Sequence, residues 1–308
     1  MPSLCLVRGH DPLTIQALPY ILLQGFLYGS TLIASRFGIG QFHPTTYAGL
    51  RMALASLCYA AFRLLDSQRQ KWPTDSRLWR HAAVLGILGT AVPMIAFISA
   101  LQYQSAGLMS VLVTSGPAIT VLMAHFFLAD EVLTKRKSVG VALALGGALL
   151  LAVRGESGLP HVSQASPLGY GLVLLGLLCV SGMTVYARKF MLDFDAFDVS
   201  TVRMFVATLA VVPLSALLVG IDLRGVDSQG YFSLGFAALM GNFAGMLLSF
   251  YNVKRFGATA AAMPLYVIPV VGGLGGALFL GEQITAGMTT GMGLIVAGIA
   301  LINQRARA

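Results

Sequence analysis

The chain is a succession of long apolar runs separated by short polar or Pro- and Gly-containing breaks. A bilayer-spanning helix needs about 20 apolar residues, because about 30 Å of hydrocarbon is crossed at about 1.5 Å per residue. The runs lack the in-out alternation of membrane β-barrel strands. The pattern predicts an all-α integral membrane protein with ten transmembrane helices. These cover residues 15–36, 45–64, 79–101, 106–129, 136–153, 167–188, 199–219, 231–252, 258–280 and 286–303.

The composition excludes several other classes of protein. Hydrophobic residues make up 56% of the chain and charged residues 10%, whereas an average soluble domain carries about 25% charged residues. Short loops leave no room for a large soluble catalytic domain or a DNA-binding module. The three cysteines, Cys5, Cys58 and Cys179, are scattered, which argues against disulfides and a metal site. Nucleotide, metalloprotease and hydrolase motifs are missing from the sequence. We therefore expect no metal and no cofactor.

The basic residues predict the orientation of the chain. If the N-terminus is cytoplasmic, fifteen Lys and Arg residues fall in cytoplasmic segments, against Arg36, Arg154 and Arg224 on the other side. This is the positive-inside bias, and it places both termini in the cytoplasm. The net charge of +8 has the same origin, so we expect the lipid bilayer and not nucleic acid as the partner. The sequence leaves the oligomeric state open, a monomer included.

The two halves of the chain are similar to each other. Arg51 matches Arg203 and Pro117 matches Pro269 at an offset of 152 residues, and Glu131 matches Glu282 at an offset of 151. Each repeat holds five predicted helices, so the second must enter the membrane from the opposite side. Inverted repeats of this kind are typical of secondary transporters, whose site lies near the midplane between the halves. The repeats cover 15–153 and 167–303, with an N-terminal segment 1–14, a linker 154–166 and a tail 304–308.

Local signatures add a family resemblance to this pattern. They are Tyr28-Gly29-Ser30, Leu50-Arg51, the stretch 100–107 that joins helices three and four, Pro117, Glu131, Arg203, Gly257-Ala258, Pro269 and Glu282. With ten spans in two repeats, the chain resembles the drug/metabolite transporter superfamily, EamA type. It is most similar there to YddG-like bacterial exporters of aromatic and other amino acids. The resemblance implies a bacterial inner-membrane exporter working by alternating access, and a periplasmic linker at 154–166. It places a cavity between helices one, three, four, six, eight and nine.

Polar and aromatic side chains within these helices are the candidates for binding a substrate. They are Gln24, Tyr28, Ser99, Tyr103, Thr114, Ser115, Tyr186, Asn242, Ser249 and Tyr266. Each could instead form a hydrogen bond between helices, as is usual in membrane bundles. Pro117 and Pro269 should bend their helices at similar depth and serve as gates. A cavity without a central fixed charge suits a small amphipathic solute of zero net charge, such as a neutral or aromatic amino acid.

Five titratable side chains are further candidates. Arg51 and Arg203 are either gates or clamps for a substrate carboxylate, or they tie their helices to neighbouring carbonyls, and the symmetric placement favours the structural role. Glu131 and Glu282 end helices four and nine, where they either couple protons or mark topology and packing. His125 either titrates near neutral pH or forms a packing hydrogen bond.

Other functions stay open as alternatives. A drug or other metabolite carrier would share the fold and all of the signatures above. A polytopic membrane enzyme would need a nucleophile, a metal triad or paired carboxylates. The one acidic cluster, Asp193, Asp195 and Asp198, is interpreted as part of a solvated loop, so we expect no enzymatic activity. A channel would need a continuous polar pore, which the two bent half-bundles do not suggest.

Overall fold

The structure is a computed structural model that describes residues 12–66, 71–129, 131–160, 162, 166–249, 251–252, 255–256 and 263–303. Within these ranges it is helical and contains no β-strand, apart from one isolated bridge between Ile39 and Phe42. The described part has nine helical segments that are long and apolar enough to cross a membrane, and Pro264–Leu280 is a shorter apolar helix. The prediction of an all-helical membrane protein is confirmed.

The first half supplies five spanning segments. They are α1 (Pro12–Phe37), α2 (Pro44–Leu65), the continuous run of α3 (Ser76–Gly86), π-helical η1 (Ile87–Ala91) and α4 (Val92–Ala100), the pair α5 (Ala106–Val113) and α6 (Gly116–Phe127), and α7 (Lys135–Arg154). The fourth span is interrupted at Thr114 and Ser115, just before Pro117 in the first turn of α6. This interruption lies where the proline was expected to bend the helix.

The second half repeats this order. It consists of α8 (Pro167–Phe190), α9 (Ala196–Leu218), α10 (Ser228–Phe236) followed by π-helical η2 (Ala237–Gly245), α12 (Pro264–Leu280) and α13 (Ala286–Asn303). The ninth helix was expected from residue 258, but α12 begins at Pro264, and 257–262 lie outside the described residues. Pro269 lies inside α12, which continues through it. The π-helical segments η1 and η2 occupy corresponding places in the third and eighth spans.

Local capping explains where several helices begin. Ser105 accepts a hydrogen bond from the Leu108 backbone at the start of α5, and Asp195 accepts from Phe197 at the start of α9. Such side chains satisfy the N–H groups that a first helical turn leaves unpaired. Gly155 and Gly281 follow α7 and α12 with φ of 64° and 63°, the left-handed conformation in which glycine ends a helix without strain.

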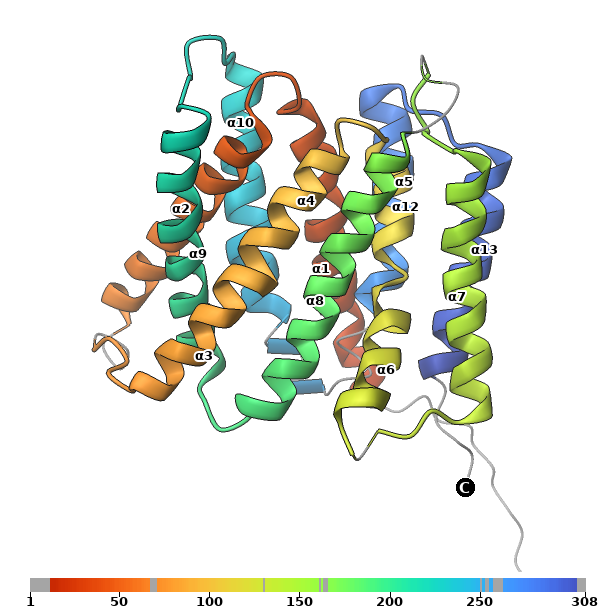
Figure 1. The fold of residues 1–308 in the computed structure, drawn as a ribbon, viewed down its shortest axis with the longest axis horizontal. Helices are drawn as coiled ribbons and strands as arrows, with labels where there is room; N and C mark the ends of the chain where they lie inside the picture. Colours follow the sequence, from red (N-terminus) through yellow and green to blue (C-terminus); the bar gives the residue numbers. More distant parts are fainter. Residues whose placement is uncertain are drawn as a thin grey trace, which may run out of the picture.

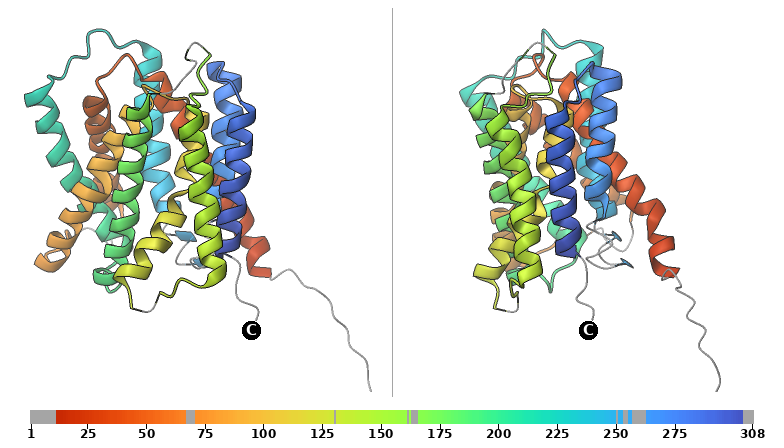
Figure 2. Two further views of the ribbon diagram at one scale, coloured as in Figure 1. Left: turned by 45° about the vertical axis from the view of Figure 1, so that its right-hand side comes forward. Right: turned by 90° about the vertical axis from the view of Figure 1, so that its right-hand side faces the viewer.

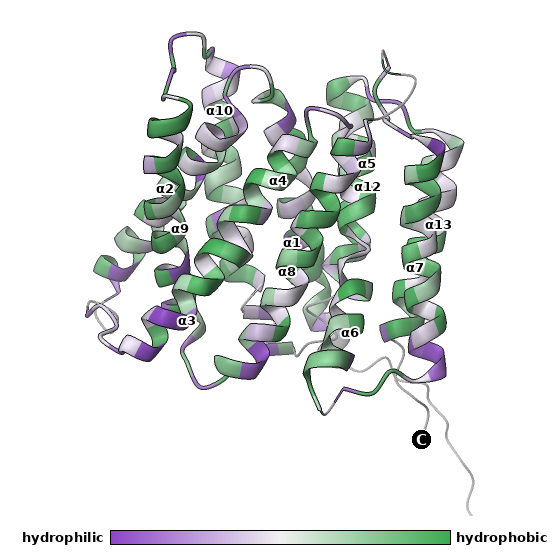
Figure 3. Cartoon of the chain, in the orientation of Figure 1, coloured by the Kyte–Doolittle hydropathy of each residue, from purple (hydrophilic) through white to green (hydrophobic). Residues whose placement is uncertain are grey.

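The helices form one bundle whose ends gather at two opposite faces (Figures 1 and 2). Hydrophilic residues concentrate at these two ends, and hydrophobic residues fill the band between them (Figure 3). The outer surface of the band is apolar as well: Leu217 is 84% exposed, and Leu278 and Val153 are each 78% exposed. A surface of this kind is stable against lipid tails, where every backbone polar group is already satisfied inside a helix.

Corresponding helices of the two halves pack against each other. A Cβ on Gly140 of α7 would lie 2.6 Å from the Gly298 carbonyl oxygen of α13, and one on Gly147 would lie 2.8 Å from that of Gly291. Small residues allow this close approach, which membrane helices use because lipid tails give them no hydrophobic drive to associate. Helices α2 and α9 also pack together, and the Ser56 and Thr208 hydroxyl oxygens lie 2.8 Å apart there.

Candidate functional site

A cavity of about 340 Å³ lies at the centre of the bundle, between the two halves. This volume is at the small end of the range for ligand pockets. Both halves contribute to its walls, through α1, α2, η1, α4 and α5 on one side and α8, α9, η2 and α12 on the other. The six predicted helices line it, and so do the second and the seventh. The cavity therefore lies at the interface between the two halves.

The cavity wall combines an apolar surface with a small polar group. Its apolar side chains include Phe97, Pro93, Met94, Val113 and Ile268. The polar side chains that line it are Tyr28, Thr31, Ser35, Arg51, Thr90, Arg203 and Asn242. Such a wall can hold an apolar body and orient one polar end.

Arg51 crosses from α2 to the other half of the molecule. Its Nε donates to Asn242 Oδ1 on η2 at 2.9 Å, and its Nη1 donates to Ser35 Oγ on α1 at 3.0 Å. Ser35 in turn donates to the Thr31 carbonyl at 2.7 Å. The Arg51 side chain is buried, with 7% exposed. The guanidinium is thus held in place by three helices.

Arg203 makes the corresponding crossing in the opposite direction, from α9 to η1. Its Nε donates to Thr90 Oγ1, and its Nη2 donates to the Gly89 carbonyl oxygen at 2.7 Å. The π-helical turn matters for this contact, because it breaks the regular hydrogen-bond ladder and is often found at functional sites. Gly241 on η2, the equivalent of Gly89, leaves space for the other arginine, because a Cβ there would lie 2.8 Å from Arg51 Nη2.

The cavity is therefore positively charged. The sequence had suggested a cavity without a fixed charge, because Arg51 and Arg203 lie toward the ends of their helices. That expectation is wrong, because both long side chains extend to the cavity, where they are part of its wall. The described lining residues contain two guanidinium groups and no Asp or Glu.

The ten predicted binding residues are distributed over several places. Tyr28 and Asn242 line the central cavity, and Ser249 interacts with the Tyr28 hydroxyl. Gln24 is buried, and its Oε1 accepts from Asn252 Nδ2 at 2.7 Å. The Thr114 hydroxyl lies 2.8 Å from the Ser110 carbonyl of its own helix and 3.3 Å from the Leu265 carbonyl of α12.

The remaining predicted residues lie away from the central cavity. Tyr186 and His81 Nδ1 are 2.7 Å apart, and Tyr266 accepts from Asn303 at 3.2 Å. Ser99 and Tyr103 are half-buried near the end of the third span, where a Cβ on Gly169 would lie 2.9 Å from Tyr103 Cβ.

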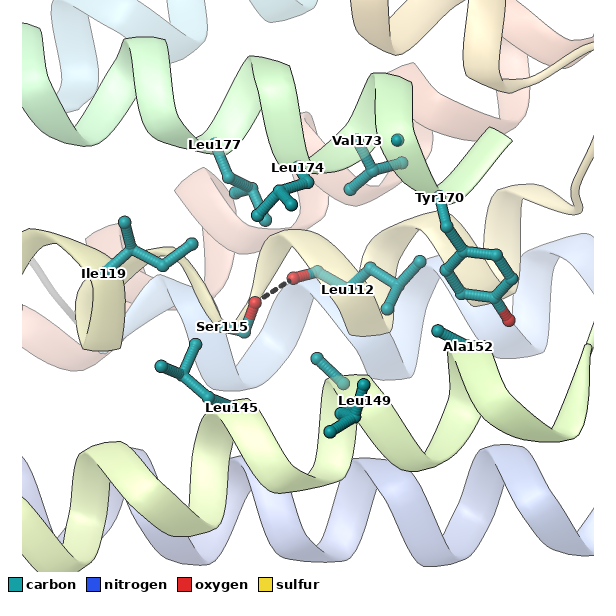
Figure 4. A pocket seen from close by; sticks show the side chains of 12 residues that line it. Leu112, Ser115, Ile119, Leu145, Leu149, Ala152, Tyr170, Val173, Leu174 and Leu177 are labelled. Carbon is teal, nitrogen blue, oxygen red and sulfur yellow. Dashed lines mark hydrogen bonds between the residues drawn. The ribbon is translucent and has the colours of Figure 1, made fainter. Parts of the chain in front are cut away.

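Ser115 lines a second pocket of about 270 Å³ between α5, α6, α7 and α8 (Figure 4). Its hydroxyl is hydrogen-bonded to the Leu112 carbonyl at 2.7 Å, so it is turned back onto its own helix. The pocket is almost entirely apolar, and Leu149 and Leu174 at its edge are 63% and 51% exposed. It is a lateral hollow in the lipid-facing band rather than a polar site.

Glu282 is a buried carboxylate that caps a helix of the other half. Its two oxygens accept from the Ala106 and Gly107 backbone N–H groups at 2.8 and 2.9 Å, at the start of α5. Burial raises the pKa of this carboxyl, while the two backbone hydrogen bonds and Arg36 act in the opposite direction. Glu282 thus fastens the loop between α12 and α13 to the fourth span.

Glu131 lies in the loop between α6 and α7, in an exposed ion-pair cluster. It pairs with Arg188 and, at 3.2 Å, with Lys137. The hydrogen bond from Arg188 is the main reason why the pKa of Glu131 is lowered. His125 Nδ1 lies 3.1 Å from the Glu131 carbonyl oxygen, so His125 is placed with this loop and not at the cavity.

Self-comparison could have identified part of the cavity that was missed. Thr31, Ser35 and Thr90 were not predicted, although Thr90 corresponds to the predicted Asn242 at the offset of 152. Gly89 matches Gly241 at the same offset, one position before Thr90 and Asn242, and this match could have identified Thr90.

Comparison of the sequence with known protein families identifies the family of this chain. The EamA-like transporter family matches residues 15–153 and, a second time, residues 167–304. The chain belongs to the EamA-like transporter family. The predicted family is confirmed, and this member is a multi-pass membrane transporter.

The relatives agree with this assignment. An uncharacterized transporter of Archaeoglobus fulgidus is 24% identical over 90% of this chain and 95% of its own length. The uncharacterized inner membrane transporter YedA of Escherichia coli is 26% identical over 90% and 87%. A probable terminal-alkyne amino-acid exporter of Streptantibioticus cattleyicolor is 26% identical over 92% of each chain. A solved crystal structure is similar to this chain with a TM-score of 0.59 and 19% sequence identity. The similarity covers 96% of this chain and 98% of the other chain, which shows the fold.

Proposed function

We propose that this EamA-like protein is a secondary transporter that exports small amphipathic metabolites, amino acids first, by alternating access between two inverted repeats. The repeats are residues 15–153 and 167–303. The observation that carries the proposal is the central cavity, which both halves build and into which each half sends an arginine from an equivalent position. Two similar packings in opposite orientations can exchange their conformations, and this exchange opens the cavity to one side and then to the other.

The contacts between the halves support an inverted arrangement. Ser56 lies against Thr208, its own equivalent at a separation of 152 residues. A residue meets its equivalent in this way only near a two-fold axis. The approach of Gly140 to Gly298 becomes the approach of Gly291 to Gly147 when each residue is exchanged for its equivalent at the offset of 151.

The arginine contacts obey the same exchange. Replacing each residue by its equivalent converts the Arg51–Asn242 hydrogen bond into the Arg203–Thr90 hydrogen bond. The two contacts thus join each half to the π-helical segment of the other. If one of these two contacts tightens while the other loosens, the halves can alternate between a cavity open to one side of the membrane and a cavity open to the other.

The proposed orientation has both termini in the cytoplasm and residues 154–166 as a periplasmic linker. The excess of Lys and Arg in the segments assigned to the cytoplasm supports it. An even number of spans also requires both ends on one face. The inner-membrane location is supported by the Escherichia coli relative.

The proposal of amino acids as substrates has two supports. The cavity offers Phe97 and Tyr28 to an apolar or aromatic side chain, together with polar groups for one charged end. The relative from Streptantibioticus cattleyicolor is a probable amino-acid exporter.

Solute counterflow in proteoliposomes tests the function. We expect vesicles preloaded with an unlabelled amino acid to take up the labelled one faster than empty vesicles do, because a carrier returns faster when it is loaded. A panel of neutral and aromatic amino acids identifies the substrate class. Uptake without trans-stimulation would indicate a channel. Counterflow of drugs or other metabolites with no response to amino acids would identify a different carrier of the same fold.

A further inference from the structure

Resting on the proposed function, we infer that the central cavity recognises its solute by a carboxylate held between Arg51 and Arg203, and that a free amino group on the solute is dispensable. The substrate class is then a monocarboxylate with an apolar body. Amino acids belong to it through their acid group, and N-acylated or amine-free analogues belong to it equally.

The first step of the argument concerns missing counter-charges. Arg63 pairs with Asp198, and Glu131 pairs with Lys137 and Arg188, so these ion pairs include neither Arg51 nor Arg203. The hydrogen bonds of Arg51 and Arg203 go to neutral oxygens of side chains and backbone. Burying a charge without a counter-ion is costly, and truncating one partner of a buried pair is strongly destabilising. An anionic group of the solute would supply the counter-charge.

The second step concerns donors that have no acceptor. Asn242 is 5% exposed, and its Nδ2 is buried without a hydrogen-bond partner among the described residues. The amide cannot turn around to relieve this, because Arg51 Nε needs Oδ1 as its acceptor. The hydrogen bonds of Arg51 occupy Nε and Nη1, and those of Arg203 occupy Nε and Nη2. One terminal nitrogen of each guanidinium is therefore left for a carboxylate, which forms its strongest hydrogen bonds with such charged donors.

The third step concerns the amino group. A zwitterionic solute would bring an ammonium group into a cavity that already holds two guanidinium groups and no described acidic side chain. Like charges at short range are unfavourable, more so in a site with little water. The acceptors present are neutral, chiefly the hydroxyls of Tyr28, Thr31 and Thr90. The charges of the cavity thus favour the acid without its ammonium.

Binding of a ligand series to the wild-type protein tests the inference. We use one apolar skeleton in five forms: 3-phenylpropanoate, N-acetylphenylalanine, phenylalanine, phenylalanine amide and phenethylamine. Thermal stabilisation of the purified full-length protein gives each affinity. We expect both acids without a free amine to bind at least as tightly as phenylalanine. The amide and the amine should bind about 30-fold or more weakly, since losing one partner of a buried charged hydrogen bond costs at least about that factor.

Equal binding of the amide or the amine would overturn the inference. So would the absence of binding by all three carboxylates. Trans-stimulated counterflow of an amino acid would then still uphold the proposed function, so the two failures are distinguishable.

Two variants connect the result to the named residues. Arg51→Gln and Arg203→Gln should each weaken 3-phenylpropanoate binding by about 30-fold and abolish the preference for the acid over the amide. Arg51→Lys keeps the charge and should retain part of the preference. Arg224→Gln is the matched control in an exposed loop and should change neither quantity. An unchanged preference in folded Gln variants would show that the arginines only tie helices together. If the Gln variants do not fold, the ligand series on the wild-type protein decides alone.

Discussion

Glu131 and Glu282 hold equivalent positions in the two halves but have opposite surroundings. Glu131 is stabilised as a carboxylate by Arg188 and Lys137, whereas Glu282 is buried against the start of α5. Their pKa values accordingly move in opposite directions from the ordinary value of 4.5. The repeat makes the residues equivalent, and the local environment makes their chemistry different.

We expect the two carboxylates to give stability profiles of opposite sign. The lowered pKa of Glu131 means that its contribution is present above pH 4.5 and is lost as the pH falls through the folded-state pKa. The raised pKa of Glu282 means that its contribution is present below pH 4.5 and is lost as the pH rises through the folded-state pKa. Thermal melting of wild type, Glu131→Gln and Glu282→Gln between pH 3 and pH 8 measures both. Profiles of the same sign for the two differences would contradict the assignment.

For single residues, the sequence predicted which positions are equivalent better than it predicted their hydrogen-bond partners. Self-comparison identified Arg51 and Arg203 as equivalent, but it favoured a structural role and placed them toward the faces of the membrane. Their contacts depend on how far a long side chain reaches across a packed interface, and linear sequence does not contain that information. Tyr186 and Tyr266 were predicted for the cavity, yet their hydroxyls meet His81 and Asn303, because a mid-span polar group pairs with whichever helix faces it.

The elements differ in how well they could be predicted. Apart from the start of the ninth helix, helix ends within the described residues agree to within a few residues, since long apolar runs, capping side chains and prolines define them. The π-helical segments η1 and η2 were not predicted. The η1 segment accepts a tertiary hydrogen bond from Arg203 at the Gly89 carbonyl, a contact that no local preference encodes. The interruption before Pro117 followed from local chemistry, whereas α12 continues through Pro269.

The contact between α7 and α13 gives a test of element packing. A Cβ on Gly298 would lie 2.5 Å from the Gly140 carbonyl oxygen and 2.6 Å from the Ala144 nitrogen, so the backbones would have to move apart. We expect Gly298→Ala to lower the free energy of unfolding by about 1–3 kcal/mol. Gly293→Ala, in the same helix with open space around it, should be neutral or stabilising by up to about 1 kcal/mol. Unfolding in a denaturing detergent compares the two, and equal effects would refute the close contact.

At the scale of the whole molecule, the all-helical membrane fold and the family followed from the sequence alone, and the described residues contain nine helices long enough to span a membrane and one shorter apolar helix. The apolar runs fix the number of crossings, and the repeated Arg, Pro and Glu positions relate the two halves. The charge of the cavity did not follow, because it arises where two halves meet. Both halves build the cavity, and each contributes an arginine to it. Alternating access between the halves is therefore the central claim.

Accessibility of a cavity position from both sides of the membrane tests that claim most directly. Met94 lines the cavity and is half-buried, so Met94→Cys is introduced after Cys5, Cys58 and Cys179 are replaced by Ala. Ser76→Cys and Gln229→Cys, at the starts of α3 and α10, are controls for the two opposite faces. We expect an impermeant thiol reagent to reach Met94→Cys from either face, with protection by the transported solute, and each control from its own face only. Reaction of Met94→Cys from a single face would contradict alternating access.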